Sequence, residues 1–330
     1  MGLAAWSASS ENACDRTSVE LELSKHPKIT ILLATRNGAE FIDQQLESYR
    51  AQTYSNWELR VSDDGSTDGT TDLIEKFSKS VAQAVTICRG PQLGFWQNFA
   101  SLVRSKDASG DLLAFSDQDD VWFADKLKNA VDWFEQISED QPALYFTRTQ
   151  LISRNGSELG FSREFTRAPS FENALVQNIG GGNTMVFNRA AQRALQKSPA
   201  SAQIVAHDWW AYQMVTGIGG LVHYDARPSL AYRQHGHNLV GKNVGIGARL
   251  KRAHGLISGQ LASWNDINLR WLGQIRAELR PENIRVLECF ARARTAWLPQ
   301  RLWLLWRSGV YRQTFVENVA LFVGATFRRL

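Results

Sequence analysis

Two carboxylates one residue apart, Asp117 and Asp119, come shortly after an apolar run at residues 112–115. Because alternate residues of an extended chain project to the same side, both can approach one point beyond the end of a strand. Mg²⁺ and Mn²⁺ prefer oxygen ligands and commonly share them with a substrate phosphate. The spacing therefore predicts a divalent-cation site, against the ordinary alternative of an acidic turn that caps a helix.

A second acidic pair, Asp63 and Asp64, follows the apolar run at residues 57–62. Asp63 lies nearer to the end of that predicted strand, where its carboxylate could accept hydrogen bonds from a base or a ribose. The alternative is an Asx turn that leads into a helix.

An earlier apolar run, residues 28–35, ends in a polar loop at residues 36–38. This loop has neither a GxGxxG nor a GxxxxGK[ST] pattern, which disfavours a dinucleotide fold and a P-loop NTPase.

Apolar, β-branched runs alternate with segments of helical spacing between these polar groups. Strands are expected at residues 28–35, 57–62, 85–88 and 112–115, and helices at 40–52, around 73–77 and at 98–103. This βαβ pattern predicts a parallel sheet with helices on both faces. Ligands of such sheets bind beyond the carboxyl ends of the strands, which is where both acidic pairs fall.

The pattern is mixed beyond residue 142. Strands are expected at 143–147, 151–153, 184–187 and 221–224, a helix near 208, and long helices within 256–279, 285–297 and 313–327. Residues 245–330 hold 14 Lys and Arg against 5 Asp and Glu, although the whole chain holds 37 against 33. A slightly acidic α/β region is therefore followed by a basic helical extension, in which five of the 12 Trp also lie.

Four segments, in this order, carry a resemblance to a known family: ITILLATRNGAEFIDQQLESYRAQTYSNWELRVSDDGSTDGT, LLAFSDQDDVWFADKL, HDWW and YRQHGHNLVG. They resemble the family-two glycosyltransferases with the GT-A fold, most nearly the bacterial rhamnosyltransferase-like enzymes of surface-polysaccharide assembly. The resemblance implies an α/β fold with a Rossmann-like, mostly parallel sheet and flanking helices. We expect a disordered leader at 1–27, a GT-A catalytic domain at 28–244 and a helical, basic, Trp-rich extension at 245–330.

The resemblance also implies roles for residues that match the family's motifs. Positions that line the nucleotide pocket are matched by Ala34, Thr35, Arg36, Asn37, Asp63 and Asn98. In the DxD motif, Asp119 is expected to bind the metal directly, while Asp117 lies nearer to the ribose and Gln118 joins the donor-binding residues. His235 is expected to complete the cation or diphosphate site, and Arg233 and Lys242 to contact the diphosphate as charge partners.

Asp208, in the segment HDWW, matches the catalytic base of inverting members of the family. Such a carboxylate takes the proton of the acceptor hydroxyl, and a metal neutralises the departing diphosphate. Without the resemblance, Asp208 would be interpreted as the N-cap of a helix. The chain departs from the family at one neighbouring position: His207 stands where many relatives have Glu.

The resemblance implies an inverting transferase that moves a sugar, rhamnose in the first instance, from a nucleotide diphosphate to a hydroxyl of a growing surface glycan. Mg²⁺ or Mn²⁺ is the expected cofactor, and a glycan or lipid-linked glycan the expected acceptor. Two alternatives stay open: another donor such as a UDP-hexose, and a catalytically inactive nucleotide-binding assembly protein. Intact Asp119 and Asp208 disfavour the inactive protein.

Composition narrows the class of protein further. Hydrophobic residues make up 44% and charged residues 21% of the chain, as in folded soluble proteins. Three widely separated cysteines, Cys14, Cys88 and Cys289, predict a reducing compartment and neither a disulfide scaffold nor a structural zinc site. The sequence shows no signal peptide and no apolar run of the ~18 residues that a membrane span needs. We expect a cytoplasmic protein.

The Arg- and Trp-rich extension has three interpretations. Trp303 and Trp306 share a helix face at i, i+3 spacing, with Arg307 beside them. Packing against the catalytic domain and peripheral contact with the inner face of the cytoplasmic membrane are equally open, because Trp and Arg are both favoured at an anionic membrane surface. Nucleic acid is not an expected partner, since no known motif supports it.

Overall fold

The computed structural model of the chain describes residues 26–198, 203–235 and 259–330. The leader predicted at residues 1–27 therefore lies almost entirely outside the described residues. The domain boundary predicted between residues 244 and 245 lies outside them too.

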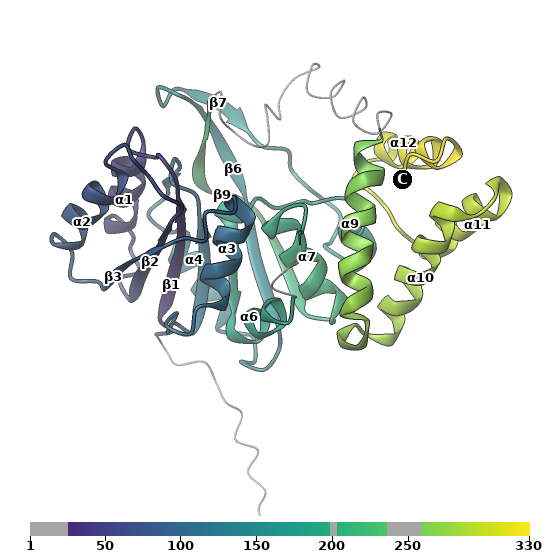
Figure 1. The fold of residues 1–330 in the computed structure, drawn as a ribbon, viewed down its shortest axis with the longest axis horizontal. Helices are drawn as coiled ribbons and strands as arrows, with labels where there is room; N and C mark the ends of the chain where they lie inside the picture. The colour runs from purple at the N-terminus through teal and green to yellow at the C-terminus, as the bar shows by residue number, and fades with distance from the viewer. Residues whose placement is uncertain (1–25, 199–202, 236–258) are drawn as a thin grey trace, which may run out of the picture.

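One mixed sheet crosses the molecule, with strand order β3-β2-β1-β4-β8-β6-β9-β5, and β7 pairs with β6 beside this path (Figure 1). The strands are β1 (Ile29–Thr35), β2 (Trp57–Asp63), β3 (Val85–Arg89), β4 (Leu112–Ser116), β5 (Val121–Trp122), β6 (Ala143–Ser153), β7 (Glu158–Phe161), β8 (Val186–Asn188) and β9 (Leu221–Gln234).

The first four strands form the predicted parallel array. β2 and β4 flank β1, and β3 pairs with β2. In this register Thr35 lies opposite Asp63, and Leu33 lies opposite Ser116. The three central strands therefore end at the same edge, and the loops that follow them lie side by side.

The second half of the sheet is less regular than its apolar runs indicated. β8 runs antiparallel to β4, β6 runs antiparallel to β8, and β9 runs parallel to β6. The two short strands predicted at 143–147 and 151–153 are one strand, β6, and the strand predicted at 221–224 extends to Gln234. Polar residues and Pro228 interrupt the apolar pattern where the β6–β9 register shifts, without ending the strand.

Helices cover both faces of the sheet (Figure 1). Leu32 packs in one apolar cluster with Phe99 and Trp209, whereas Ile31 packs in a second cluster with Leu46. The first cluster lies under α3 (Phe95–Arg104), α5 (Phe171–Ala174), α6 (Arg189–Gln196) and α7 (His207–Gly217); the second lies under α1 (Ile42–Arg50), α2 (Thr70–Ser78) and α4 (Lys126–Phe134). Burial on both faces explains why the parallel strands read as continuous apolar runs.

The C-terminal helices share the first of these cores. They are α9 (Gln260–Gln274), the 3₁₀ turn η2 (Arg276–Glu278), α10 (Pro281–Thr295), α11 (Leu298–Ser308) and α12 (Phe315–Thr326). Phe290, Leu305 and Leu321 are fully buried in the cluster that holds Trp209 and Phe171. Within the described ranges, no helix is both long and apolar enough to cross a bilayer.

Candidate active site

The DxD segment follows β4 at the carboxyl edge of the sheet. His235, just past the end of β9, lies with Nε2 2.5 Å from Oδ2 of Asp119. The sheet therefore brings together Asp119 and His235, two predicted metal ligands that are far apart in the sequence. Phe41 stacks on the His235 ring, with 5.3 Å between the ring centroids, and so fixes its orientation.

Asp208 lies in the first turn of α7, a helix whose N-cap is Ala206. Its Oδ1 accepts a hydrogen bond from the backbone N–H of Trp209 (2.6 Å), and its Oδ2 accepts one from the N–H of Gly182 (3.2 Å). Asp208 is thus not itself the N-cap. The short 3₁₀ helix η1 (Gly182–Thr184) holds one oxygen of the carboxylate from the opposite side.

The carboxylate of Asp208 acts electrostatically on that of Asp117. Burial raises the pKa of Asp117 to about 7, and the nearby charges of Asp119 and Asp208 add to the effect. Burial also raises the pKa of Asp208 to about 6, although backbone N–H groups of Trp209 and Gly182 oppose the shift. The predicted base therefore lies near the DxD motif.

Asp63 closes the turn after β2 rather than standing free. Its carboxylate accepts hydrogen bonds from the hydroxyls of Thr35 (2.7 Å) and Ser66 (2.5 Å) and from the N–H groups of Gly65 (3.0 Å) and Ser66 (2.7 Å). Burial works against its charge, but these bonds hold the pKa of Asp63 below its usual range. Asp63 therefore stays ionised and fixes the loop at the end of β2.

Gln118, the central residue of DxD, clamps the loop after β1. Its Oε1 accepts a hydrogen bond from the N–H of Arg36 (2.8 Å), and its Nε2 donates to the carbonyl of the same residue (3.1 Å). Asn37 in turn accepts from the N–H of Thr67 (2.9 Å) and donates its own N–H to Ser66 (2.8 Å). The predicted donor-binding loops after β1, β2 and β4 are thus tied into one unit.

Asn98 lies beneath this unit on α3 and is 2% exposed. Its Nδ2 donates to the carbonyl of Ser62 (2.9 Å), and its Oδ1 is buried without a hydrogen-bond partner among the described residues. Ala34 is half-buried near the end of β1. All the residues predicted to bind the donor therefore gather at the carboxyl edge of β1, β2 and β4.

A buried polar network supports the DxD segment from below, and sequence reasoning missed it. Nδ2 of Asn183 donates to Asp120, and Nζ of Lys126 donates to the carbonyl of Asn183 (2.8 Å). Burial lowers the pKa of Lys126 to about 7 and raises that of Asp120 well above its usual range, because it disfavours the charged form of each group. The DQDD run pointed to Asp120, but nothing in the sequence pointed to a buried Lys126.

Arg233 has a different role from the predicted contact with a diphosphate. Arg233 is 1% exposed. It donates from Nε to the carbonyl of Asp119 (3.0 Å) and from Nη2 to Oε1 of Gln44 (2.6 Å). Its guanidinium lies 4.8 Å from the centroid of the Phe41 ring. A donor buried in this way positions the DxD backbone. The other charge partner of the motif, Lys242, lies outside the described residues.

The two ring nitrogens of His207, the residue before Asp208, are buried. The His207 ring stacks on Phe99, with 3.9 Å between centroids, and both ring nitrogens lack hydrogen-bond partners among the described residues. Burial lowers the pKa of His207 to about 3, so the ring is neutral near pH 7. A Cβ built at Gly182 would collide with Nε2 of His207, which explains why glycine suits the position whose N–H reaches Asp208.

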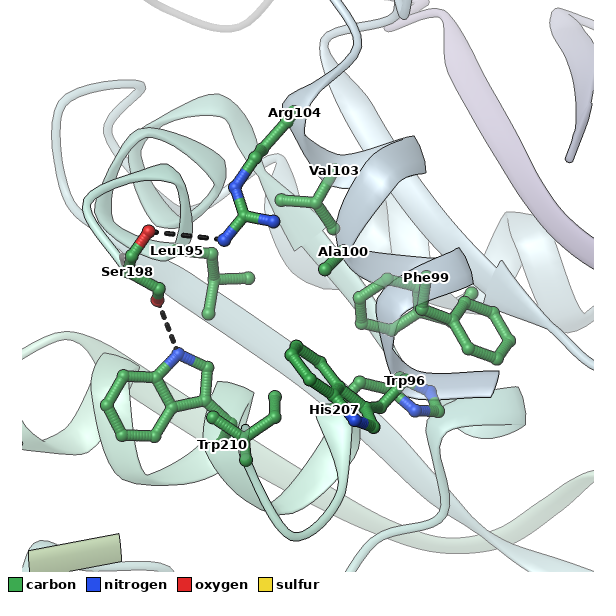
Figure 2. A pocket seen from close by; sticks show the side chains of 11 residues that line it. Trp96, Phe99, Ala100, Val103, Arg104, Leu195, Ser198, His207 and Trp210 are labelled. Carbon is green, nitrogen blue, oxygen red and sulfur yellow. Dashed lines mark hydrogen bonds between the residues drawn. The ribbon is translucent and has the colours of Figure 1, made fainter. Parts of the chain in front are cut away.

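A small, partly open cavity of about 30 Å³ lies between α3 and α7, and Figure 2 shows the side chains that line it. Trp96, Phe99 and His207 gather on one side, while Trp210 donates to the hydroxyl of Ser198 on the other. The cavity has room for about one water molecule, which is far less than a nucleotide sugar requires. The donor site predicted at the open sheet edge is therefore distinct from this cavity.

The donor set at the sheet edge fits a hard divalent cation shared with a substrate. Among the described residues, no three His, Cys, Asp or Glu side chains form a complete cage. Asp119 and His235 nevertheless offer two adjacent ligands, and Asp117 belongs to the same motif as Asp119. Mg²⁺ sites commonly use one or two carboxylates and take their remaining ligands from phosphate and water.

The sheet topology, the flanking helices and the acidic carboxyl edge are those of a GT-A glycosyltransferase. Residues 30–195 match the family model described as glycosyl transferase family 2. This chain belongs to glycosyltransferase family 2.

Individual relatives are bacterial glycosyltransferases. The chain is 31% identical over 234 residues to the dTDP-rhamnosyl transferase RfbG of Shigella flexneri, a match that covers 67% of this chain and 77% of RfbG. It is 36% identical over 163 residues to the UDP-Glc:alpha-D-GlcNAc-diphosphoundecaprenol beta-1,3-glucosyltransferase WfgD of Escherichia coli, covering 49% and 60% of the two chains.

Solved structures support the fold. TarS 1–349 of S. aureus superposes with a TM-score of 0.52 at 16% identity, covering 85% of this chain and 80% of that one. Its complex with UDP gives the same TM-score at 14% identity, covering 92% and 89%. The predicted GT-A fold is thereby confirmed.

Proposed function

We propose that this protein is an inverting glycosyltransferase that moves rhamnose from dTDP-rhamnose to a hydroxyl of a growing surface glycan. One observation carries the proposal: the N–H of Gly182 donates to Asp208, and the side chain of the next residue, Asn183, donates to Asp120 beside the DxD motif. A general base and the DxD motif thus face the same space, as a single displacement requires.

Asp208 acts as the general base. The acceptor oxygen attacks the anomeric carbon as the bond to the diphosphate breaks, its proton passes to Asp208, and the configuration inverts. The N–H groups of Gly182 and Trp209 orient the carboxylate. A pKa of about 6 leaves Asp208 ionised near pH 7 but more basic than an exposed aspartate.

Asp119 and His235 hold a divalent cation, Mg²⁺ or Mn²⁺, with Asp117 beside them. When bound, this cation supplies positive charge that stabilises the diphosphate leaving group. Ala34, Thr35, Arg36, Asn37, Asp63, Asn98 and Gln118 shape the nucleotide pocket. Gln118 and Asp63 act there by fixing the three loops against one another.

The similarity to RfbG supports dTDP-rhamnose as the donor. A UDP-hexose is the second candidate, because WfgD, whose name specifies UDP-Glc, is 36% identical over its matched segment. The acceptor of WfgD is linked to diphosphoundecaprenol, which supports a lipid-linked glycan as the acceptor here. Such an acceptor would bring the protein to the inner face of the cytoplasmic membrane.

A transfer assay tests the proposal. The protein is incubated with Mn²⁺, lipid-linked acceptors of defined structure, and either dTDP-rhamnose or a UDP-hexose, and the anomeric configuration of each product is determined by NMR. We expect a product inverted relative to its donor from dTDP-rhamnose. Product only from a UDP-hexose would change the donor, and a retained configuration would contradict Asp208 as the base.

A further inference from the structure

The outer face of α12 is apolar although it is exposed. Phe315, Val316, Val319, Val323 and Phe327, which we call the apolar stripe, include four residues at successive i+4 positions, so they share one helix face. Phe315 is 82%, Val316 74% and Phe327 71% exposed. The opposite side of α12 buries Leu321, Gly324 and Ala325, so the stripe is a second apolar face, and an apolar face of this kind is normally covered.

The charges around the stripe favour an anionic cover. From residue 289 to residue 330 the sequence holds seven Arg and a single acid, Glu317. Glu317 is turned inward, where it pairs with Arg163 at 2.6 Å. Arg328 and Arg329, next to Phe327, are exposed. Basic groups beside exposed apolar residues are the combination that an anionic lipid surface attracts.

Exposed tryptophans lie on the adjacent helix α11. Trp306 is 72% and Trp303 49% exposed, and the guanidinium of Arg307 lies 5.0 Å above the Trp303 ring. Trp is favoured at the headgroup level of a bilayer because its ring is apolar while its N–H needs a polar partner. Lipid therefore suits this surface better than nucleic acid, which would leave the aliphatic stripe uncovered.

The helix that carries the stripe also lies on the side of the molecule toward which the strands of the acidic site run. In Figure 1, α12 and β7 both lie on the upper side, toward which β1 and β4 run. The Arg163–Glu317 pair joins the segment after β7 to the first turn of α12. The loop between β6 and β7 reaches the site in turn, since Arg154 pairs with Glu40 (2.6 Å) and its carbonyl accepts from Arg233 (2.8 Å).

The geometry points to α12 as a membrane-docking helix that inserts the apolar stripe into an anionic bilayer, with the Arg and Trp residues of α11 and the Arg residues that follow α12 at the headgroups. This inference rests on the proposed function in one respect, since docking there holds the acidic site beside a lipid-linked acceptor. It also specifies the surface: α12 contacts lipid, whereas the buried sides of α9 to α11 pack on the catalytic core.

Vesicle binding by the full chain tests this inference. The double variant Val319→Glu/Val323→Glu places two charges within the stripe at exposed positions. Leu221→Glu is the matched control, because Leu221 is 46% exposed at the start of β9, at the sheet edge opposite to the acidic site. We expect the parent and the control to co-sediment with phosphatidylglycerol vesicles and not with phosphatidylcholine alone. The double variant should lose at least about tenfold in partition coefficient.

Parallel measurements separate the possible failures. Thermal melts establish that each variant is folded, sedimentation velocity gives its oligomeric state, and calorimetry gives its nucleotide binding. Equal vesicle binding by the parent and the double variant would overturn the inference. It would also be overturned if the parent bound no vesicles but formed a dimer, and the double variant were monomeric. If the parent bound vesicles but no nucleotide, the result would instead count against the proposed function alone.

Discussion

Asp208 combines two properties that a general base needs at neutral pH. Two N–H groups orient its carboxylate, and burial raises its pKa to about 6. Its neighbour His207 stays neutral because burial lowers its pKa to about 3. At the residue scale, an ionisation near pH 6 that controls the rate is therefore expected from Asp208 rather than from His207.

The pH dependence of kcat/KM tests this assignment. Asp208 must be ionised to accept a proton, so with saturating cation the rate should fall about tenfold for each pH unit below 6 and level off above it. Asp208→Asn should reduce kcat about 10²- to 10⁴-fold and abolish this acid limb, with nucleotide affinity retained. An acid limb unchanged in Asp208→Asn would assign the ionisation to another group.

At the element scale, the site depends on loops that are fixed to one another before any ligand binds. The parallel register aligns the ends of β1, β2 and β4, and Gln118 then ties the β4 loop to Arg36. Most of these elements were predictable, because strands buried on both faces leave continuous apolar runs. The length of β9 and the burial of Arg233 were not, since both depend on long-range contacts with β6 and α1 that have no local pattern.

Substitution of Gln118 tests the importance of this clamp. Gln118→Ala removes both hydrogen bonds to the Arg36 backbone, so nucleotide affinity should fall about five- to thirtyfold, the equivalent of about 1–2 kcal/mol. Gln83→Ala is the control, because its Nε2 also bonds a backbone carbonyl, that of Ser55, at the amino end of the strands. Calorimetry that gives equal affinities for the two variants would contradict a role for the clamp in donor binding.

At the scale of the whole molecule, the C-terminal helices belong to the same hydrophobic core as the sheet. Phe290, Leu305 and Leu321 are fully buried in the cluster that contains Trp209. The sequence predicted a helical extension after the catalytic domain, and helices are present there. Its composition did not reveal that the two regions share one core, because Arg and exposed Trp dominate the pattern of the helices.

A chain ending at residue 258 tests the consequence of this shared core. Removal of α9 to α12 uncovers the apolar side of α7, so the shortened chain should melt at least about 10 °C below the full chain, or aggregate. Differential scanning calorimetry of both chains provides the measurement. An unchanged melting temperature for the sheet would mean that the two regions fold independently.

The central claim is that the acidic sheet edge binds a nucleotide diphosphate together with a divalent cation. Calorimetric titration of dTDP, UDP and GDP, each with and without Mn²⁺, tests it on the parent and on Asp119→Ala. We predict that one nucleotide, dTDP, binds only with Mn²⁺ and that Asp119→Ala abolishes this binding. If no nucleotide bound under any condition, or if Asp119→Ala bound as tightly as the parent, the site would not be the donor site of a glycosyltransferase.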